Sequence, residues 1–260
     1  MKLAITGKGG TGKTTVAGIL VHLFNKDGFK VLAVDADPDA NLASAIGIPS
    51  KKAASILPIS KQRQLITERT GAKPKQFGQL FKINPTVRDI PDNFCINYHN
   101  IKLLVMGAVQ KGGSGCACPE NVLLRSLLSE IILNRDEVVI VDMEAGIEHL
   151  GRSTSQAIEK MLIVVEPGSR SVFTAKSIMR LARDIGVETF GIIANKIQDE
   201  DQKKWIHDQF PDNQVLGMIP YSKIVLESDL RQQPLIDILD KSLKTEFEKI
   251  YRECRGPAIQ

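Results

Sequence analysis

The chain has 260 residues, of which 43% are hydrophobic and 25% charged, and its formal net charge at pH 7 is +4. This size predicts one large domain over residues 1–260, and so mild a charge does not by itself indicate a nucleic-acid partner. No apolar run approaches the roughly 18–20 residues that span a bilayer, and the first residues do not resemble a signal peptide. We therefore expect a cytoplasmic protein without a membrane partner, whose four cysteines are reduced thiols.

The first fifteen residues hold the most informative motif. The apolar run from Met1 to Thr6 has strand character, and the segment after Thr15 has helical character. Between them, Gly7 to Thr14 fits the phosphate-binding pattern of glycine, four residues and Gly-Lys-Thr. Glycines let backbone N–H groups converge on phosphate oxygens, and the following helix adds its positive dipole end. The predicted nucleotide-binding residues of this loop are Lys8, Gly9, Gly10, Thr11, Gly12, Lys13, Thr14 and Thr15.

Two side chains of the loop have distinct expected roles. Lys13 supplies a point charge for the β- and γ-phosphates of ATP, and the Thr14 hydroxyl can bind Mg²⁺. The same glycines also fit the Gly-x-Gly-x-x-Gly pattern of dinucleotide-binding turns, with Asp35 as a ribose-binding acid. The Gly-Lys-Thr-Thr ending favours ATP, because a dinucleotide has no γ-phosphate and needs no magnesium.

A second lysine, Lys8, lies inside the loop. The sequence Gly-Lys-Gly-Gly-Thr-Gly-Lys-Thr-Thr resembles the deviant Walker A motif of the MinD/ParA/nitrogenase-iron-protein class of ATPases. This resemblance implies a homodimer that encloses two nucleotides, in which Lys8 reaches the phosphates bound by the partner. The alternative is a solvated loop lysine.

A buried strand predicted over 30–34 leads into three acids, Asp35, Asp37 and Asp39. Carboxylates at a strand end beside a phosphate-binding loop suit phosphate and magnesium chemistry, so Asp37 is a candidate magnesium ligand. In the resembled class this segment is switch I, which implies that Asp37 orients or activates the attacking water. Asp39 either caps a helix near Leu42 or takes part in catalysis, and the sequence leaves both roles open.

Residues 48–100 look like an insertion. Positions 51–90 contain nine lysines or arginines but only two acids, and the insertion is divided into short pieces by Pro58, Pro74, Pro85 and Pro91. We expect helices near 60–70 and 75–81. Such a basic segment could bind an acidic protein or DNA, or could be ordinary solvated surface.

The second informative motif is Cys116-Ala-Cys118, between a strand predicted over 101–108 and a helix predicted over 121–133. Cys118 precedes the helix, whose positive end favours the thiolate form that metals bind. Thiolates suit Zn²⁺, Ni²⁺ or Cu⁺. Two cysteines cannot complete a tetrahedral site, but a symmetric dimer would supply four sulfurs. Cys95, in an expected strand, and Cys254 look like ordinary thiols.

The remaining elements continue the strand–helix alternation. The strand predicted over 137–141 ends in Asp142-Met-Glu-Ala-Gly146, which resembles switch II. That resemblance implies that Asp142 holds magnesium through water and that the Gly146 backbone donates to the γ-phosphate. Strands are also expected over 161–165, 189–194 and 214–220, with helices over 171–185 and near the carboxyl end.

Two positions are candidates for contacts with the base. The resembled class places an asparagine against the adenine edge, and this position corresponds to Asn195. Pro220, at the end of the last strand, could flank the base. The alternative for Asn195 is a turn without a nucleotide role. The alternation as a whole predicts a P-loop NTPase-like, doubly wound α/β fold, with a mostly parallel sheet and helices on both faces.

The whole chain resembles one group within this class. The segment from Gly107 to Asn121, together with the loop motif, is similar to the carbon monoxide dehydrogenase maturation ATPases of the CooC type and the related acetyl-CoA synthase accessory ATPases. The resemblance implies a homodimer, formed with ATP or metal, that holds one Ni²⁺ or Zn²⁺ between paired Cys116 and Cys118. It further implies slow hydrolysis of ATP to ADP with Mg²⁺, catalytic roles for Lys8, Lys13 and Asp37, and a nickel–iron–sulfur client enzyme.

Two other functions fit the ATPase motif. A ParA- or MinD-like positioning ATPase would bind DNA or a partner through the basic insertion, but it has no need for Cys-x-Cys, which makes DNA an unlikely partner. An iron–sulfur reductase also uses interface cysteines, but at two separated positions. The client enzyme, the physiological metal and the step that drives metal transfer are left open by the sequence.

Overall fold

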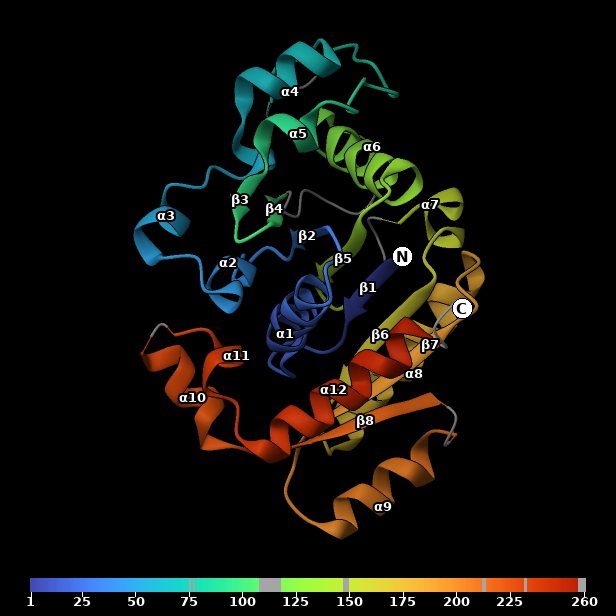
Figure 1. The fold of residues 1–260 in the computed structure, drawn as a ribbon. Helices are drawn as coiled ribbons and strands as arrows, with labels where there is room; N and C mark the ends of the chain where they lie inside the picture. The colour runs from blue at the N-terminus through green and yellow to red at the C-terminus, as the bar shows by residue number, and fades with distance from the viewer. Residues whose placement is uncertain are drawn as a thin grey trace.

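The computed structural model describes residues 1–74, 76, 78–107, 118–146, 150–211, 214–231 and 233–256. One twisted sheet crosses the molecule, and helices cover both of its faces (Figure 1). Across the sheet the described strands are β3 (Ile96–Tyr98), β4 (Ile101–Val105), β2 (Val31–Ala36), β5 (Val138–Met143), β1 (Lys2–Thr6), β6 (Lys160–Val165), β7 (Phe190–Ile197) and β8 (Val215–Pro220). All neighbours pair in parallel except β3, which runs antiparallel to β4 at the edge, so the predicted mostly parallel sheet is confirmed.

The helices of the described residues follow the strands in alternation. In chain order they are α1 (Lys13–Lys26), α2 (Leu42–Ile46), α3 (Ser50–Ala54), the 3₁₀ turn η1 (Ile59–Lys61), α4 (Arg63–Thr70), α5 (Ile90–Phe94), α6 (Pro119–Asn134), α7 (Arg152–Gln156), α8 (Ser169–Asp184), α9 (Glu200–Gln209), α10 (Lys223–Leu230), α11 (Leu235–Ile238) and α12 (Lys241–Arg255).

The core consists of two apolar layers, one on each face of the sheet. Successive strand residues alternate between them: Leu3 and Ile5 of β1 belong to one layer and Ala4 to the other. Helices α1, α2, α11 and α12 complete the first layer, and α4, α5, α6, α8 and α9 complete the second. Because both faces are covered, the inner strands are continuous hydrophobic runs, as is usual in parallel sheets.

The order of the strands determines which chain segments meet at the carboxyl edge. Strand β5 lies between β2 and β1, and in this register Asp142 is the neighbour of both Asp35 and Ile5. The ends of β1, β2 and β5 therefore bring the phosphate-binding loop and the two acidic segments together. Ligands of open α/β sheets bind at this edge.

The inserted segment is only partly as predicted. The helix expected near 60–70 is present as η1 and α4, and Leu65 and Ile66 pack in the same core layer as α6. The prediction of a helix over 75–81 is wrong, because the described residues of this range, 76 and 78–81, are not helical. Instead, the Gln79 amide exchanges two hydrogen bonds of 2.9 Å with the backbone of Lys73, which closes a loop.

Two cysteines lie apart from the carboxyl edge. Cys95 was expected in a strand, and this prediction is wrong. The residue ends α5 and immediately precedes β3. Cys254 is buried in α12, the predicted closing helix. This helix packs closely on β8. A Cβ added to Gly217 of β8 would come within 2.4 Å of Ile250 of the helix, so only glycine fits there. No helix among the described residues combines the length and hydropathy needed to cross a membrane.

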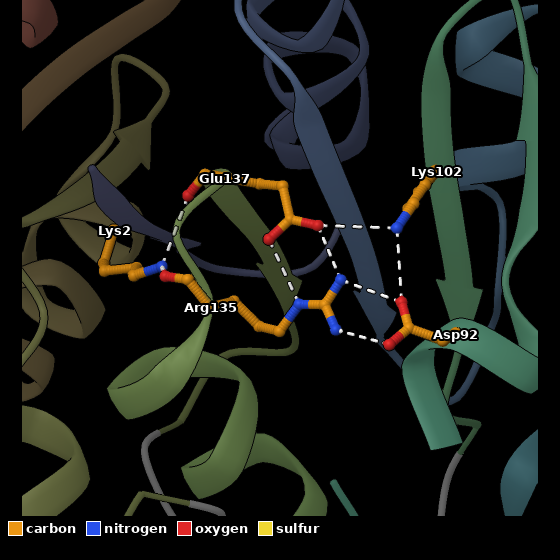
Figure 2. Close-up of polar contacts among 5 residues, drawn as sticks. All are labelled: Lys2, Asp92, Lys102, Arg135 and Glu137. Carbon is orange, nitrogen blue, oxygen red and sulfur yellow. Dashed lines mark hydrogen bonds and ion pairs between the residues drawn. The ribbon is translucent and has the colours of Figure 1, made fainter. Parts of the chain in front are cut away.

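A charged cluster joins five elements at the amino edge of the sheet (Figure 2). The Arg135 guanidinium donates to both carboxylates of the cluster, with distances of 2.6 and 3.1 Å to Glu137 and 3.0 Å to each oxygen of Asp92. Lys102 pairs with the same two acids at 3.3 and 3.5 Å. Lys2 donates to the backbone oxygens of Arg135 and Glu137. The cluster therefore ties α5 and the end of α6 to the starts of β1, β4 and β5.

Glu137 is the least exposed acid of this cluster, with 11% of its side chain accessible. Hydrogen bonds from Arg135 lower the pKa of Glu137 to about 2 from the usual 4.5. Because the folded pKa is depressed, the associated stability is fully present above about pH 4.5 and is lost as the pH falls towards 2.

We predict that Glu137→Gln lowers the free energy of unfolding at pH 7 by about 1–2 kcal/mol, since one pKa unit corresponds to about 1.4 kcal/mol and partial exposure screens the pair. Urea unfolding at pH 7 and pH 3 checks this, because the difference from wild type should shrink at the lower pH. Glu200→Gln, which breaks an exposed pair with Lys203, is the control and should leave stability unchanged. Equal losses at both pH values would contradict the assignment.

Candidate nucleotide-binding site

The loop between β1 and α1 has the backbone geometry of an anion site. Gly12 precedes α1 in the left-handed region, with φ 95°, and no side chain caps the helix. The first-turn N–H groups therefore lack side-chain acceptors and suit a phosphate. Glycine is required at two positions: a Cβ at Gly7 would lie 2.3 Å from the Val164 oxygen, and one at Gly12 would lie 2.3 Å from the Asn195 amide nitrogen.

The tip of the loop is closed by its own hydrogen bonds. The buried Thr11 hydroxyl donates to the Lys8 carbonyl at 2.8 Å, and the Thr11 N–H points to the same oxygen at 3.3 Å. Gly9 and Gly10 are exposed at the tip. The half-buried Lys8 side chain makes no hydrogen bond or ion pair with the described residues, so it is available for a contact outside the chain.

Lys13 lies beneath the loop and is nearly buried, with 7% of its side chain exposed. Its Nζ is 3.9 Å from Asp37, which is the weak end of ion-pair geometry. The backbone N–H of Asp39 donates to Asp37 at 3.0 Å and holds that carboxylate at the start of the acidic segment. Two of the predicted catalytic residues, Lys13 and Asp37, are thus side by side.

The two acids that end β2 and β5 are fully buried. Neither oxygen of Asp142 has a hydrogen-bond partner among the described residues. Burial raises the pKa of Asp142 to about 7, and neighbouring Asp35 adds to the rise, whereas the nearby Thr14 hydroxyl and Lys13 act to lower it. Thr14 is thus close to Asp142 without meeting hydrogen-bond geometry. Burial also raises the pKa of Asp35, to about 6.

These residues fit a magnesium ion. Buried, unpartnered carboxylate oxygens need a cation or hydrogen-bond donors, and Mg²⁺ prefers oxygen ligands. Asp142 and Thr14 would hold the ion, with Asp37 nearby, and the ion would neutralise phosphate charge. Within the described part of the chain, no three His, Cys, Asp or Glu side chains form a metal cluster. Magnesium in nucleotide sites does not need such a cluster, because phosphate and water complete its shell.

The geometry corrects two alternatives for the acidic segment. Asp35 is not available to a ribose, because it is buried and accepts the N–H groups of Leu42 at 2.9 Å and Asp37 at 3.3 Å. Capping of α2 by Asp39 is also wrong. The helix begins at Leu42 after Asn41, which makes no side-chain cap, and the Asp35 carboxylate takes the Leu42 N–H instead.

A cavity of about 480 Å³ lies beside the loop. Asn195, Pro220 and Tyr221 line it together with Gly12 and Thr15, so the two predicted base-contact positions meet next to the phosphate site. The Asn195 amide donates to the Thr11 carbonyl at 2.7 Å rather than pointing freely into the cavity. Its contact with adenine remains a prediction, as does that of the half-buried Gly146 with phosphate.

The cysteine motif is only partly described. Cys118 immediately precedes α6, as predicted, and Pro119 occupies the first turn. Cys116 lies outside the described residues, so the Cys-x-Cys metal site stays a prediction. Sequence reasoning did not assign a role to Glu166 or Lys196, although both lie at strand ends close to the loop.

Comparison with known proteins agrees with this geometry. Residues 2–235 match the family model described as the CobQ/CobB/MinD/ParA nucleotide binding domain. The chain belongs to this family. Membership of this nucleotide-binding family, together with the relatives described below, identifies the chain as an ATPase.

Two relatives are close in sequence over nearly the full chain. An uncharacterised ATP-binding protein of Methanocaldococcus jannaschii is 49% identical, with 96% of each chain covered. The carbon monoxide dehydrogenase accessory protein CooC of Rhodospirillum rubrum is also 49% identical, over 88% of this chain and 87% of its own. The resemblance to CooC-type members of the CobQ/CobB/MinD/ParA family is thus confirmed.

A solved structure in the same family shares the fold. The septum site-determining protein MinD of Pyrococcus horikoshii, complexed with Mg-ADP, superposes with a TM-score of 0.69 and 20% identity, covering 97% of this chain and 95% of that one. The two chains therefore share the same fold.

We predict that Asp142→Asn weakens the magnesium dependence of nucleotide binding but stabilises the nucleotide-free protein. The buried Asp142 carboxylate has no hydrogen-bond partner in the part of the chain that the structure describes, and its raised pKa means that the cost of its charge appears as the pH rises from about 4 and is complete above about 7. Urea unfolding at pH 8 should show a gain of about 2–4 kcal/mol, from about 1.4 kcal/mol per pKa unit.

Asp35→Asn is the matched control, because the Asp35 charge is supported by two backbone N–H groups and should be less costly. Its gain at pH 8 should be smaller. Wild type should bind ADP more tightly with Mg²⁺ than with a chelator. If Asp142→Asn bound ADP with the same affinity under both conditions, the magnesium role of Asp142 would be supported. Unchanged magnesium dependence in the variant would refute it.

Proposed function

We propose that this chain is a homodimeric Mg-ATPase that assists nickel insertion into carbon monoxide dehydrogenase or the related acetyl-CoA synthase. The observation that carries the proposal is the 49% identity, over 88% of the chain, to a protein named as a carbon monoxide dehydrogenase accessory protein. The Cys-x-Cys motif supports it, because a dimer would offer four thiolates to a soft or borderline cation.

The position of Cys118 favours coupling between nucleotide and metal. Cys118 heads α6, whose other end, Arg135, lies at the amino edge of the sheet. The start of α6 is therefore at the carboxyl edge, where the nucleotide would bind. Strand β4, which precedes the cysteine segment, pairs with β2 so that Val105 is beside Asp35. A shift of the acidic segment with ATP could thus be transmitted to the paired cysteines.

In this proposal residues 1–260 form one cytoplasmic ATPase domain, with an insertion over about 48–100. Lys13 and the loop N–H groups hold phosphate oxygens, and Lys8 reaches the nucleotide of the partner protomer. Asp37 orients the attacking water. Magnesium, bound by Thr14 and Asp142, would supply charge neutralisation. Hydrolysis is slow until a partner completes the site, and the nickel ion is cargo rather than a resident cofactor.

Metal content tests the cargo role. Anaerobic protein loaded with excess Ni²⁺, or in parallel Zn²⁺, and then desalted should retain about half an ion per chain, since four thiolates from two chains close one site. The double variant Cys116→Ser/Cys118→Ser should retain none. The control is Cys95→Ser, which removes a thiol whose pKa burial raises to about 12 and which should retain metal as wild type does.

Loss of metal only in the double variant would establish the shared site. If neither wild type nor Cys95→Ser retained metal, the proposed cargo role would fail, while the ATPase assignment would stand. Attention would then turn to the basic segment.

Light scattering coupled to gel filtration tests the dimer. We predict that Lys8→Ala abolishes dimerisation with a non-hydrolysable ATP analogue but leaves the monomer folded, because this side chain makes no hydrogen bond or ion pair with the described residues. Lys26→Ala, at the exposed far end of α1, is the control for loss of one positive charge and should dimerise. Dimerisation of Lys8→Ala at wild-type nucleotide concentrations would remove the cross-dimer role.

A positioning ATPase that binds DNA or a partner is the second candidate, and the insertion favours it. Basic residues are exposed there: Lys51, Lys52, Lys61, Arg63, Lys73, Lys82 and Arg88. Binding of the ATP-loaded protein to DNA with a steep salt dependence would support this candidate. Nothing in it calls for the cysteine motif, so metal retention separates the two functions.

A further inference from the structure

Two successive residues at the end of β7 hold two successive carbonyls of the phosphate-binding loop. The Asn195 amide donates to the Thr11 carbonyl at 2.7 Å, and the Lys196 ammonium donates to the Gly10 carbonyl at 2.7 Å. The Asn195 side-chain oxygen accepts the Lys196 N–H at 2.9 Å, which fixes the amide in this orientation. The loop is therefore supported from β7, a strand far away in sequence.

The backbone of Lys196 is unusual. Its φ is +62°, in the left-handed region that glycine and asparagine adopt at least cost. The other described non-glycine residues with positive φ, His99 and Asn100, form the turn between β3 and β4, whereas Lys196 lies within a strand. Pairing of β7 with β8 shifts register between Ala194 and Ile197, so Asn195 and Lys196 form a bulge opposite the single residue Ile219.

This bulge turns the Lys196 side chain towards the loop. A lysine in a conformation better suited to glycine indicates that the side chain is used. Its ammonium also pairs with Glu166 at 3.2 Å, just after β6. Glu166 is held in turn, because its N–H donates to the Ser171 hydroxyl at 3.1 Å. The ammonium thus lies between the Glu166 carboxylate and the Gly10 carbonyl.

Fixing these carbonyls fixes the N–H groups of the same peptides. In a planar trans peptide the C=O and N–H bonds point in opposite directions. With the Thr11 carbonyl directed to β7, the Gly12 N–H faces the opposite side. With the Gly10 carbonyl held by Lys196, the Thr11 N–H faces the Lys8 oxygen that closes the tip. The Gly12 N–H is thus directed, and the tip of the loop closed, before the phosphate arrives, which lowers the ordering cost of binding.

We propose that Lys196 is a positioning residue that preorganises the phosphate-binding loop through Gly10, with Glu166 orienting the ammonium. It acts through the loop and does not touch the phosphates. This role rests on the nucleotide binding of the family and not on metal delivery, so the metal and dimer experiments can fail without affecting it.

The left-handed backbone permits a test in which folding is preserved. Lys196→Gly and Lys196→Asn both suit this φ, so their nucleotide-free unfolding temperatures should equal or exceed that of wild type. Calorimetry should show affinity for MgADP reduced about tenfold in each, as for loss of one charge-assisted hydrogen bond. Lys196→Arg, which keeps a cation, should restore most of the affinity, and Glu166→Gln should lose about twofold because the amide oxygen still accepts.

Lys203→Met is the control, since it removes a lysine from an exposed pair with Glu200 on α9 and should bind MgADP as wild type does. The proposal is overturned if Lys196→Gly and Lys196→Asn bind MgADP within about twofold of wild type, since a loss of one such hydrogen bond is larger. It is equally overturned if Lys196→Arg is as weak as Lys196→Gly, because a cation would then not be what the loop requires.

Discussion

The register of three central strands is the constraint on which the site depends. Strand β5 pairs with both β2 and β1. This pairing places Asp35, Asp142 and the start of the phosphate-binding loop side by side at the carboxyl edge. Asp142 is buried there and has no hydrogen-bond partner among the described residues, and Lys13 is 3.9 Å from Asp37. A buried carboxylate and a weakly paired cation are both suited to a magnesium-bound polyphosphate.

The two edges of the sheet use charge in opposite ways. At the amino edge, Arg135 joins Glu137 and Asp92 in bidentate pairs, and this cluster fastens helices to strand starts (Figure 2). At the carboxyl edge, Asp142 lacks hydrogen bonds among the described residues. Satisfied charges contribute stability, whereas unsatisfied ones are retained where a ligand will complete them. This division matches a scaffold whose function lies at one edge only.

The phosphate-binding loop is also supported from its far side. Its glycines are required by close approach, to Val164 at Gly7 and to Asn195 at Gly12. Asn195 and Lys196 then hold its carbonyls from the end of β7. A motif that is continuous in sequence therefore depends on strands β6 and β7 for its shape, which is consistent with a site that binds phosphate before any large rearrangement.

The sequence alone determined the nucleotide loop, the parallel α/β fold, the closing helix and the CooC-like family. The loop, the fold and the helix are encoded locally, by glycine spacing and by hydrophobic periodicity, whereas the CooC-like family was inferred from the resemblance of the loop motif and of residues 107–121. Tertiary structure alone decided that Asp35 accepts the Leu42 N–H in place of an Asp39 cap, and that Gln79 closes a loop where a helix was expected. It also decided that Lys196 reaches Gly10. Each of these three contacts depends on strand register or on a side chain that competes for backbone groups. Strand register and such competition cannot be deduced from neighbours in sequence.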